Sequence, residues 1–191
     1  MTQGLRDGHL TVATFIHSRV ETCSVCLGDG CAVCAGEGFV RVEKLWESPP
    51  TPNALMNEGE LNILHSYLSN QNNPAQFVIR LFGSTPVETD SLASLSNEPG
   101  GNTGYVAPVI NRDATTAGWP IFDFSGGNAR AKTRTVTFRA TGPVSYPQIT
   151  HAVLATSSDN TGKLIDATAL ATPRQLASGE VLDVIYQPSL S

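Results

Sequence analysis

Apolar and β-branched residues fall in short runs along the chain, and clusters of Gly, Pro, Ser and Asn separate these runs. Runs of this length and composition are typical of β-strands joined by turns. We therefore predict strands at residues 9–22, 39–46, 77–82, 105–110, 133–141, 149–156, 163–170 and 181–187. Short strands at regular spacing indicate a mainly β fold, with a body that is an antiparallel β-sandwich or barrel.

One segment has the spacing of a helix instead. Its apolar residues, which fall near helical spacing, are Leu55, Leu61, Ile63, Leu64, Tyr67 and Leu68. Asn53 can cap the start of this helix, and the polar run at 69–74 ends it. We expect the apolar stripe of the helix to belong to the core.

Three prolines between residues 49 and 52 predict a stiff linker, because proline cannot continue a strand ladder. The chain then divides into three parts. Residues 1–50 form a β-ribbon arm, residues 51–74 form the proline linker and the helix, and residues 75–191 form the β-sandwich body.

Charged residues make up only 15% of the 191-residue chain, and the net charge is −5. An average soluble domain has roughly 25% charged residues, and a general nucleic-acid binder needs a basic face. The one basic cluster contains Arg130, Lys132, Arg134 and Arg139. We interpret it as a solvated or interface-facing strand rather than a phosphate site.

Neither a transmembrane run nor a secretory signal is recognisable in the sequence, so we expect the protein to fold in a reducing cytoplasm. In that compartment, four cysteines indicate metal binding rather than disulfides.

The four cysteines lie in a unit, C-x-x-C-x-G-x-G, that occurs twice with a period of eight residues. They are Cys23, Cys26, Cys31 and Cys34. Each C-x-x-C turn points two thiolates at one centre, and the glycines that follow free backbone amides to donate hydrogen bonds to sulfur. Four thiolates match a closed tetrahedral Zn²⁺ site, so we predict one structural zinc ion per chain at the tip of the ribbon.

Two alternatives to zinc stay open on the sequence alone. One or two disulfides can form if the protein matures in an oxidising medium, and an iron–sulfur cluster also takes four cysteines, although its usual spacings differ. His17 lies upstream and can replace one cysteine as a ligand. It is more simply interpreted as a strand residue.

The repeated unit at residues 23–38 resembles half of the cysteine-rich zinc-binding region of DnaJ-type chaperones. That family carries four such units, whereas this chain has two and lacks the His-Pro-Asp motif of a J-domain. The resemblance therefore implies metal binding by the four cysteines and does not imply chaperone activity.

A second resemblance begins at about Leu55 and rests on short motifs in a fixed order. They are Leu-Met-Asn-x-Gly-Glu at 55–60, Thr-Pro-x-x-Thr-Asp at 85–90, Glu-Pro-Gly-Gly-Asn-Thr-Gly-Tyr at 98–105, Gly-Trp at 118–119, Val-Thr-Phe at 136–138, Thr-Gly-Pro at 141–143 and Ser-Gly-Glu at 178–180. This order is similar to that of a family of tailed-bacteriophage virion proteins, which are tail-fibre, minor tail or capsid-associated components. The resemblance implies a β-rich structural protein with no catalytic residues.

Sequence motifs for an enzyme are missing as well. The chain has no G-x-S-x-G, Walker, H-E-x-x-H or G-x-G-x-x-G motif, and its four histidines, His9, His17, His65 and His151, are scattered. We therefore expect a non-enzymatic capsid decoration or cement protein of a bacteriophage virion, a homotrimer that contacts the major capsid protein. The alternatives are a tail or fibre component, or a small zinc-ribbon adaptor that binds a host protein.

Overall fold

Strands dominate the computed structural model, which describes residues 11–26, 31–35, 37–48, 51–69, 73–125 and 128–190. The strands are β1 (Thr11–Thr22), β2 (Phe39–Glu47), β3 (Thr51–Leu55), β4 (Gln76–Phe82), β5 (Val109–Asn111), β6 (Ile121–Ser125), β7 (Asn128–Lys132), β8 (Val136–Arg139), β9 (Ile149–Ala155), β10 (Leu164–Arg174), β11 (Glu180–Gln187) and β12 (Ser189–Leu190). The helices are α1 (Asn57–Ser69) and two short 3₁₀-helices, η1 (Ala32–Cys34) and η2 (Gly101–Thr103). The prediction of a mainly β fold with one helix is confirmed.

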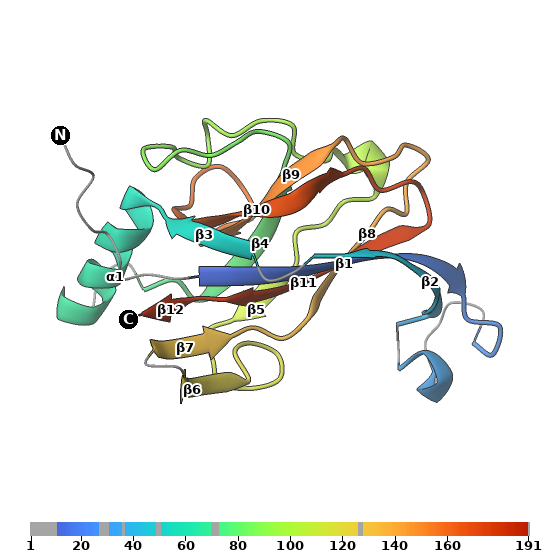
Figure 1. The fold of residues 1–191 in the computed structure, drawn as a ribbon, viewed down its shortest axis with the longest axis horizontal. Coiled ribbons are helices and arrows are strands. Elements are labelled where there is room, and N and C mark those ends of the chain that lie inside the picture. The colour runs from blue at the N-terminus through green and yellow to red at the C-terminus, as the bar shows by residue number, and fades with distance from the viewer. Residues whose placement is uncertain are drawn as a thin grey trace.

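Every strand pair in the described residues is antiparallel. The large sheet has the order β5-β4-β9-β10-β3-β1-β11-β8, and β2 pairs with β1 beside this path (Figure 1). A small sheet has the order β12-β7-β6. The edge strands β5 and β8 do not pair with each other, so the described residues form no closed barrel. The antiparallel prediction is confirmed, and the barrel alternative is wrong.

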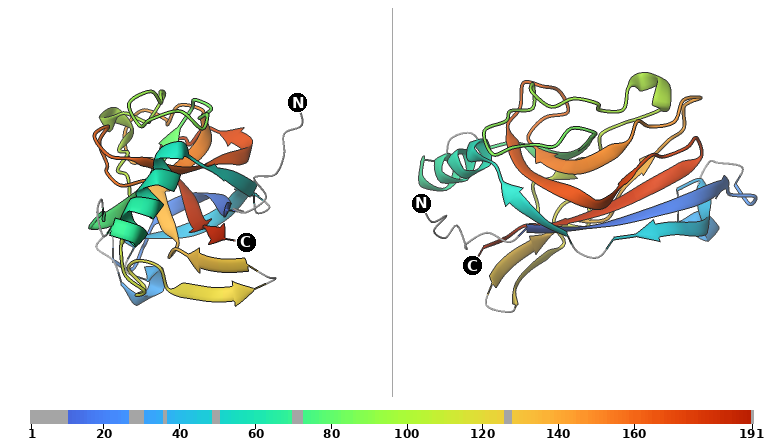
Figure 2. Two further views of the ribbon diagram at one scale, coloured as in Figure 1. Left: turned by 90° about the vertical axis from the view of Figure 1, so that its left-hand side faces the viewer. Right: turned by 45° about the horizontal axis from the view of Figure 1, so that its top comes forward.

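The large sheet coils so that its two ends share one core (Figure 2). Ile79 and Leu81 of β4 lie in the same buried cluster as Val136 and Phe138 of β8, although five strands separate β4 from β8 in the sheet order. Arg134, which precedes β8, bridges the open side, because its guanidinium donates a 2.9 Å hydrogen bond to the carbonyl of Val109 in β5. The right-handed twist of neighbouring strands, accumulated over a long sheet, produces such coiling.

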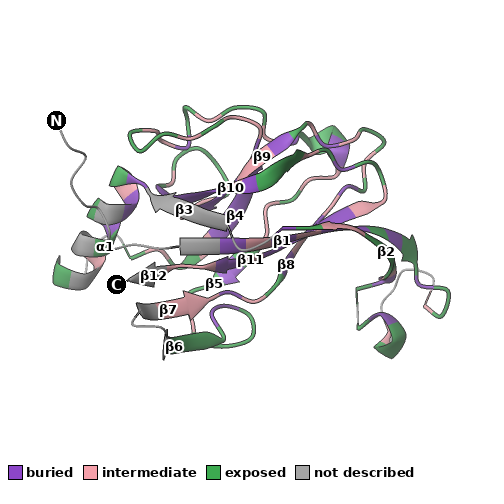
Figure 3. Cartoon of the chain, viewed as in Figure 1, coloured by how far each residue is buried: buried purple, intermediate pink, exposed green. Residues whose placement is uncertain are grey.

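A second buried cluster lies on the other face of β4, β9 and β10. It contains Met56, Phe82, Leu92, Val153, Ala155, Leu164 and Ala167. Leu92 comes from the long polar loop between β4 and η2, so this loop covers the second face of the sheet. Strand β4 is therefore buried on both faces, as its apolar sequence predicts, and buried residues fill the centre of the molecule (Figure 3).

The linker prediction is wrong at Thr51 and Pro52, which begin strand β3. Strand β3 pairs with β1 through its residues 51–53 and with β10 through its residues 53–55. Pro52 therefore has a ladder neighbour on one side only, and its missing amide hydrogen is tolerated as at a sheet edge. Pro49 and Pro50 lie outside the described residues.

Helix α1 starts later than predicted, and part of its predicted apolar stripe faces solvent. Asn53 lies in β3 and does not cap the helix. Leu61, Ile63 and Leu68 are exposed, so the core prediction is wrong for these three members of the stripe. The side chains of Leu55, Leu64 and Tyr67 lie outside the described part of the structure. The helix docks instead through Gly59, where an added Cβ would meet the backbone carbonyl oxygen of Ile165 at 2.1 Å. This close backbone approach leaves no room for a leucine face against β10.

Replacing Gly59 with Ala tests the docking of α1. Alanine inside a helix is intrinsically favoured over glycine by about 1 kcal/mol, whereas overpacking typically costs ~1–3 kcal/mol. The added Cβ would clash with backbone atoms of Ile165, so we expect the overpacking cost to exceed the gain in helix propensity. Gly59→Ala should therefore lower the free energy of unfolding by about 1 kcal/mol or more in urea titrations. Gly100→Ala is the control, because nothing lies within 4 Å of its Cβ. A Gly59→Ala protein more stable than the parent would contradict the docking geometry.

Candidate metal centre

The structure brings the four predicted cysteines together at the tip of the β1–β2 ribbon. Their sulfur atoms all lie within 4.8 Å of one another. The Sγ atoms of Cys23 and Cys31 are 3.6 Å apart, and so are those of Cys26 and Cys34. Both pairs join equivalent positions of the two repeated units. The Sγ atoms of Cys31 and Cys34 are 3.8 Å apart.

The cluster begins where the ladder of the ribbon ends. Strand β1 ends at Thr22 and β2 begins at Phe39, and the amide of Cys23 donates a 3.0 Å hydrogen bond to the carbonyl of Gly38. This bond closes the ribbon directly below the sulfurs. Between the strands the chain turns sharply enough to bring cysteines eight residues apart into contact.

Backbone amides of the second repeated unit donate to sulfur, as the glycine pattern predicts. The amides of Cys31 and Gly38 each lie 3.3 Å from the Sγ of Cys34. Gly38 has a φ of 74°, in the left-handed region that glycine adopts without strain. The matching glycines of the first unit, Gly28 and Gly30, lie outside the described residues.

These amides also favour the thiolate form that a metal requires. Burial by itself would raise the pKa of Cys34, but hydrogen bonds from Cys31 and Gly38 and from the neighbouring sulfurs outweigh it and lower the pKa to about 6. Backbone hydrogen bonds from Val25 and Cys26 likewise lower the pKa of Cys23. A thiolate is the ligating form of cysteine, so four convergent sulfurs in this setting can bind a metal ion.

Histidine takes no part in the cluster among the described residues. His17 is buried in β1, and its Nε2 lies 2.9 Å from a carboxylate oxygen of Glu180. His151 lies in β9, where burial lowers its pKa. His65 falls within α1, and His9 lies outside the described residues. The interpretation of His17 as a strand residue fits this position.

The base of the ribbon is fixed to the body by charged and aromatic contacts. The guanidinium of Arg41 in β2 donates two hydrogen bonds, of 2.9 and 2.8 Å, to the carboxylate of Asp183 in β11. It also donates 2.7 Å to Glu37, next to the cysteine cluster. The guanidinium of Arg139 in β8 lies 4.4 Å from the ring centre of Phe39. The tip itself extends beyond these contacts and away from the body (Figures 1 and 2).

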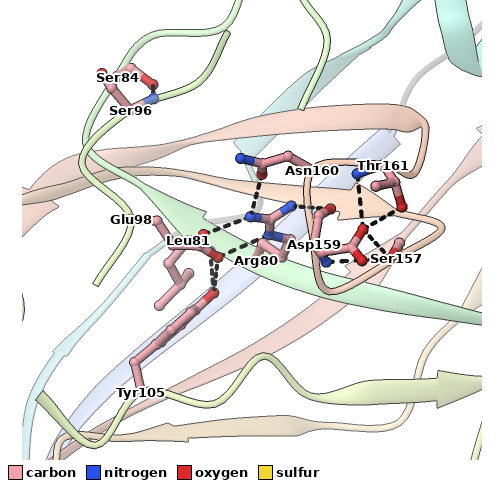
Figure 4. A network of polar contacts seen from close by, with 10 residues as sticks. All are labelled: Arg80, Leu81, Ser84, Ser96, Glu98, Tyr105, Ser157, Asp159, Asn160 and Thr161. Carbon is pink, nitrogen blue, oxygen red and sulfur yellow. Dashed lines mark hydrogen bonds and ion pairs between the residues drawn. The ribbon is translucent and has the colours of Figure 1, made fainter. Parts of the chain in front are cut away.

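A second polar constellation surrounds Arg80, and the sequence does not reveal it (Figure 4). Arg80 is buried in β4, and its guanidinium donates to both carboxylate oxygens of Glu98, at 2.9 and 2.6 Å. It also donates to the carbonyl of Asp159 and to the side chain of Asn160. The hydroxyl of Tyr105 donates to Glu98 at 3.0 Å. All three guanidinium nitrogens donate hydrogen bonds, so this network fixes two loops to β4.

The predicted basic cluster is largely engaged in contacts within the chain. Arg130 forms an ion pair with Asp123 across the β6–β7 hairpin. Arg134 donates to backbone carbonyls, and Arg139 lies over Phe39. The cluster does not lie on one strand, because Arg130 and Lys132 belong to β7, Arg139 belongs to β8, and Arg134 lies between the two strands. These contacts leave little of the cluster to bind phosphate.

Comparison with known proteins adds no family to this picture. No protein-family profile matches the chain, and no curated protein matches it. Among the described residues, none of the helices has the length and apolarity needed to cross a membrane. The site must therefore be interpreted from its own geometry.

Cys34→Ser tests whether the cluster holds the ribbon together. The variant removes the sulfur that accepts two backbone amides, so the tip should open while β1 stays paired with β11. We expect trypsin to cut at Arg41 and Lys44 about tenfold faster or more, as cleavage follows the population of the open form. Val33→Ser, at the same tip, is the control that leaves all four sulfurs in place. Equal cleavage of the two variants, or unfolding of the whole chain, would contradict this role.

Arg80→Lys tests the buried network. Lysine keeps the positive charge but lacks the planar fork that reaches Glu98, Asp159 and Asn160 together. We expect a loss of about 1–3 kcal/mol in the free energy of unfolding, measured by urea denaturation. Arg19→Lys is the matched control, because the Arg19–Glu43 pair is solvent-exposed and worth at most about 1 kcal/mol. Equal effects of the two substitutions would show that the buried fork is unimportant.

Proposed function

We propose that the cluster binds one Zn²⁺ through Cys23, Cys26, Cys31 and Cys34 as a closed structural site. The sulfur spacing is the observation that carries the proposal. Zinc–sulfur bonds are about 2.3 Å long, so the corners of a regular tetrahedron lie about 3.8 Å apart. Three of the six sulfur separations are 3.6, 3.6 and 3.8 Å and fit this edge length, and all six are within 4.8 Å. Four protein sulfurs also leave no open position for a substrate.

The two alternatives fit the sulfur spacing less well. A disulfide requires sulfurs about 2.05 Å apart, much closer than the 3.6 Å of the nearest pairs. In an iron–sulfur cluster the inorganic core lies between the cysteine sulfurs and holds them farther apart than one shared ion does. One small tetrahedral ion therefore explains the arrangement best, and zinc is the ion that takes four thiolates without redox chemistry.

We further propose that the chain is a non-enzymatic structural component of a bacteriophage virion, where it decorates or cements the capsid. The metal-bound ribbon would be rigid and projects from the body, which suits a clamp laid over a neighbouring subunit. The partners in this proposal are other copies of the chain, as a homotrimer, and the major capsid protein. A tail or fibre position is the alternative within the same particle.

Exposed apolar side chains support an assembly role. Outside the ribbon they occur on α1, as Leu61, Ile63 and Leu68, and on the β6 hairpin, as Ile121 and Phe122. Such residues are buried when subunits associate, and apolar patches on a surface mark interaction sites. The exposed ribbon charges Arg19 and Lys44 are paired with Glu43 and Glu47, so they present no basic face to nucleic acid.

Metal content and assembly state test the proposal together. The protein, purified under reducing conditions, is expected to contain one zinc per chain by elemental analysis and to form trimers by light scattering. Zinc loss with a chelator should open the ribbon to trypsin as Cys34→Ser does, because structural zinc contributes folding free energy. A monomer at all concentrations would contradict the assembly role, and protein without zinc but with oxidised cysteines would contradict the metal site.

A further inference from the structure

The two repeated units present the same apolar side chain at the tip of the ribbon. Val25 lies between the cysteines of the first unit and Val33 between those of the second, eight residues later. Each valine is 64% exposed. Each lies in a turn between two cysteines whose sulfurs contact the sulfurs of the other unit. The other described tip residues are small, as Ser24, Ala32 and Ala35, and they are exposed (Figure 3).

The same tip carries acidic residues and no basic ones. Between residues 20 and 40 the sequence has Glu21, Asp29 and Glu37 and neither lysine nor arginine, and Asp29 lies outside the described residues. Glu37 is compensated by its ion pair with Arg41 at the ribbon base, but Glu21 is exposed. A zinc ion bound by four thiolates adds a net charge of −2, because two positive charges meet four negative ones.

We propose that the tip is a docking surface for a partner protein with a basic surface that surrounds a shallow apolar depression. This inference rests on the proposed zinc site, which supplies part of the negative charge and fixes the two valines. Val25 and Val33 would enter the depression, and lysine or arginine side chains at its rim would face the tetrathiolate and Glu21. Nucleic acid and acidic membranes are disfavoured, because both would bring negative charge against the tip.

The position of the tip suits this role. The ribbon base is fixed through Arg41 and Asp183, and Phe39 is buried against Val20 and Val181. Beyond this base the tip projects from the body, as Figure 1 and the right-hand view of Figure 2 show. A rigid, projecting tip loses little conformational entropy on binding, so a small apolar contact can contribute to affinity.

The test uses the full chain and two labelled amphipathic peptides, one of alternating leucine and lysine and one of alternating leucine and glutamate. Fluorescence anisotropy is expected to show binding of the lysine peptide only, weakened by added salt. The double variant Val25→Ser with Val33→Ser should bind it about tenfold more weakly, the loss expected when two valines no longer bury their methyl groups. Val106→Ser with Val144→Ser is the matched control, since both valines are exposed elsewhere and the control should bind like the parent.

Zinc content is measured in the same samples, so that a failure of the docking proposal can be distinguished from a failure of the zinc proposal. Zinc-loaded protein that does not bind the lysine peptide, or that binds it equally in both double variants, would overturn the docking surface and leave the metal site intact. Undiminished binding after removal of zinc by a chelator would also overturn it, because the tetrathiolate charge and the fixed tip would then be irrelevant. Binding of a labelled DNA duplex through the same valines would overturn the choice of a protein partner.

Discussion

Strand β1 is the element on which both the body and the ribbon depend. One of its edges pairs with β11 from Val12 to Arg19, and the other pairs first with β3 and then with β2. The β1–β2 ladder has two irregularities, opposite His17/Ser18 and Arg19/Val20, where β2 carries the extra residues Leu45 and Val42 and the chain passes from the body into the ribbon. Such bulges bend and twist a strand. The ribbon is therefore continuous with the central sheet through a shared strand, and its direction is set by the ladder of the body.

The ribbon requires a second constraint at its far end. Its base has contacts with the body through Arg41 and Phe39, but among its described residues the segment that carries the cysteines contributes only Cys23 and Cys34 to the buried apolar set. A segment of this size cannot hold a fixed turn by apolar burial alone, and the proposed metal ion would supply the missing free energy. In this proposal the four sulfurs fix one end of the ribbon, and the ion pair between Arg41 and the buried Asp183 fixes the other.

Local sequence pattern predicted much of the strand content and all four cysteines of the cluster. The alternation and composition of β4, β9 and β11 are strong enough to fix these strands, and the spacing of the repeated C-x-x-C turns places their sulfurs at one centre. Strand β3 was missed because proline argues against a ladder, and the sequence does not show that Pro52 is paired on one side only. Strand β7 was missed because its alanine and charged residues are weak strand formers, whereas β6 holds Ile121, Phe122 and Phe124 and its composition could have revealed it.

Features that depend on distant partners were not predictable. The helix stripe of Leu61 and Leu68 indicated a buried face, but the close approach of Gly59 to Ile165 turns that face to solvent. Arg80 is a lone charge inside an apolar strand, and its partners Glu98 and Asn160 lie far along the chain in loops.

Zinc K-edge X-ray absorption of the reduced, purified chain tests the central claim most directly. The account predicts four sulfur neighbours at about 2.3 Å and no oxygen or nitrogen ligand. A mixed shell with two sulfurs, or no bound zinc, would contradict it.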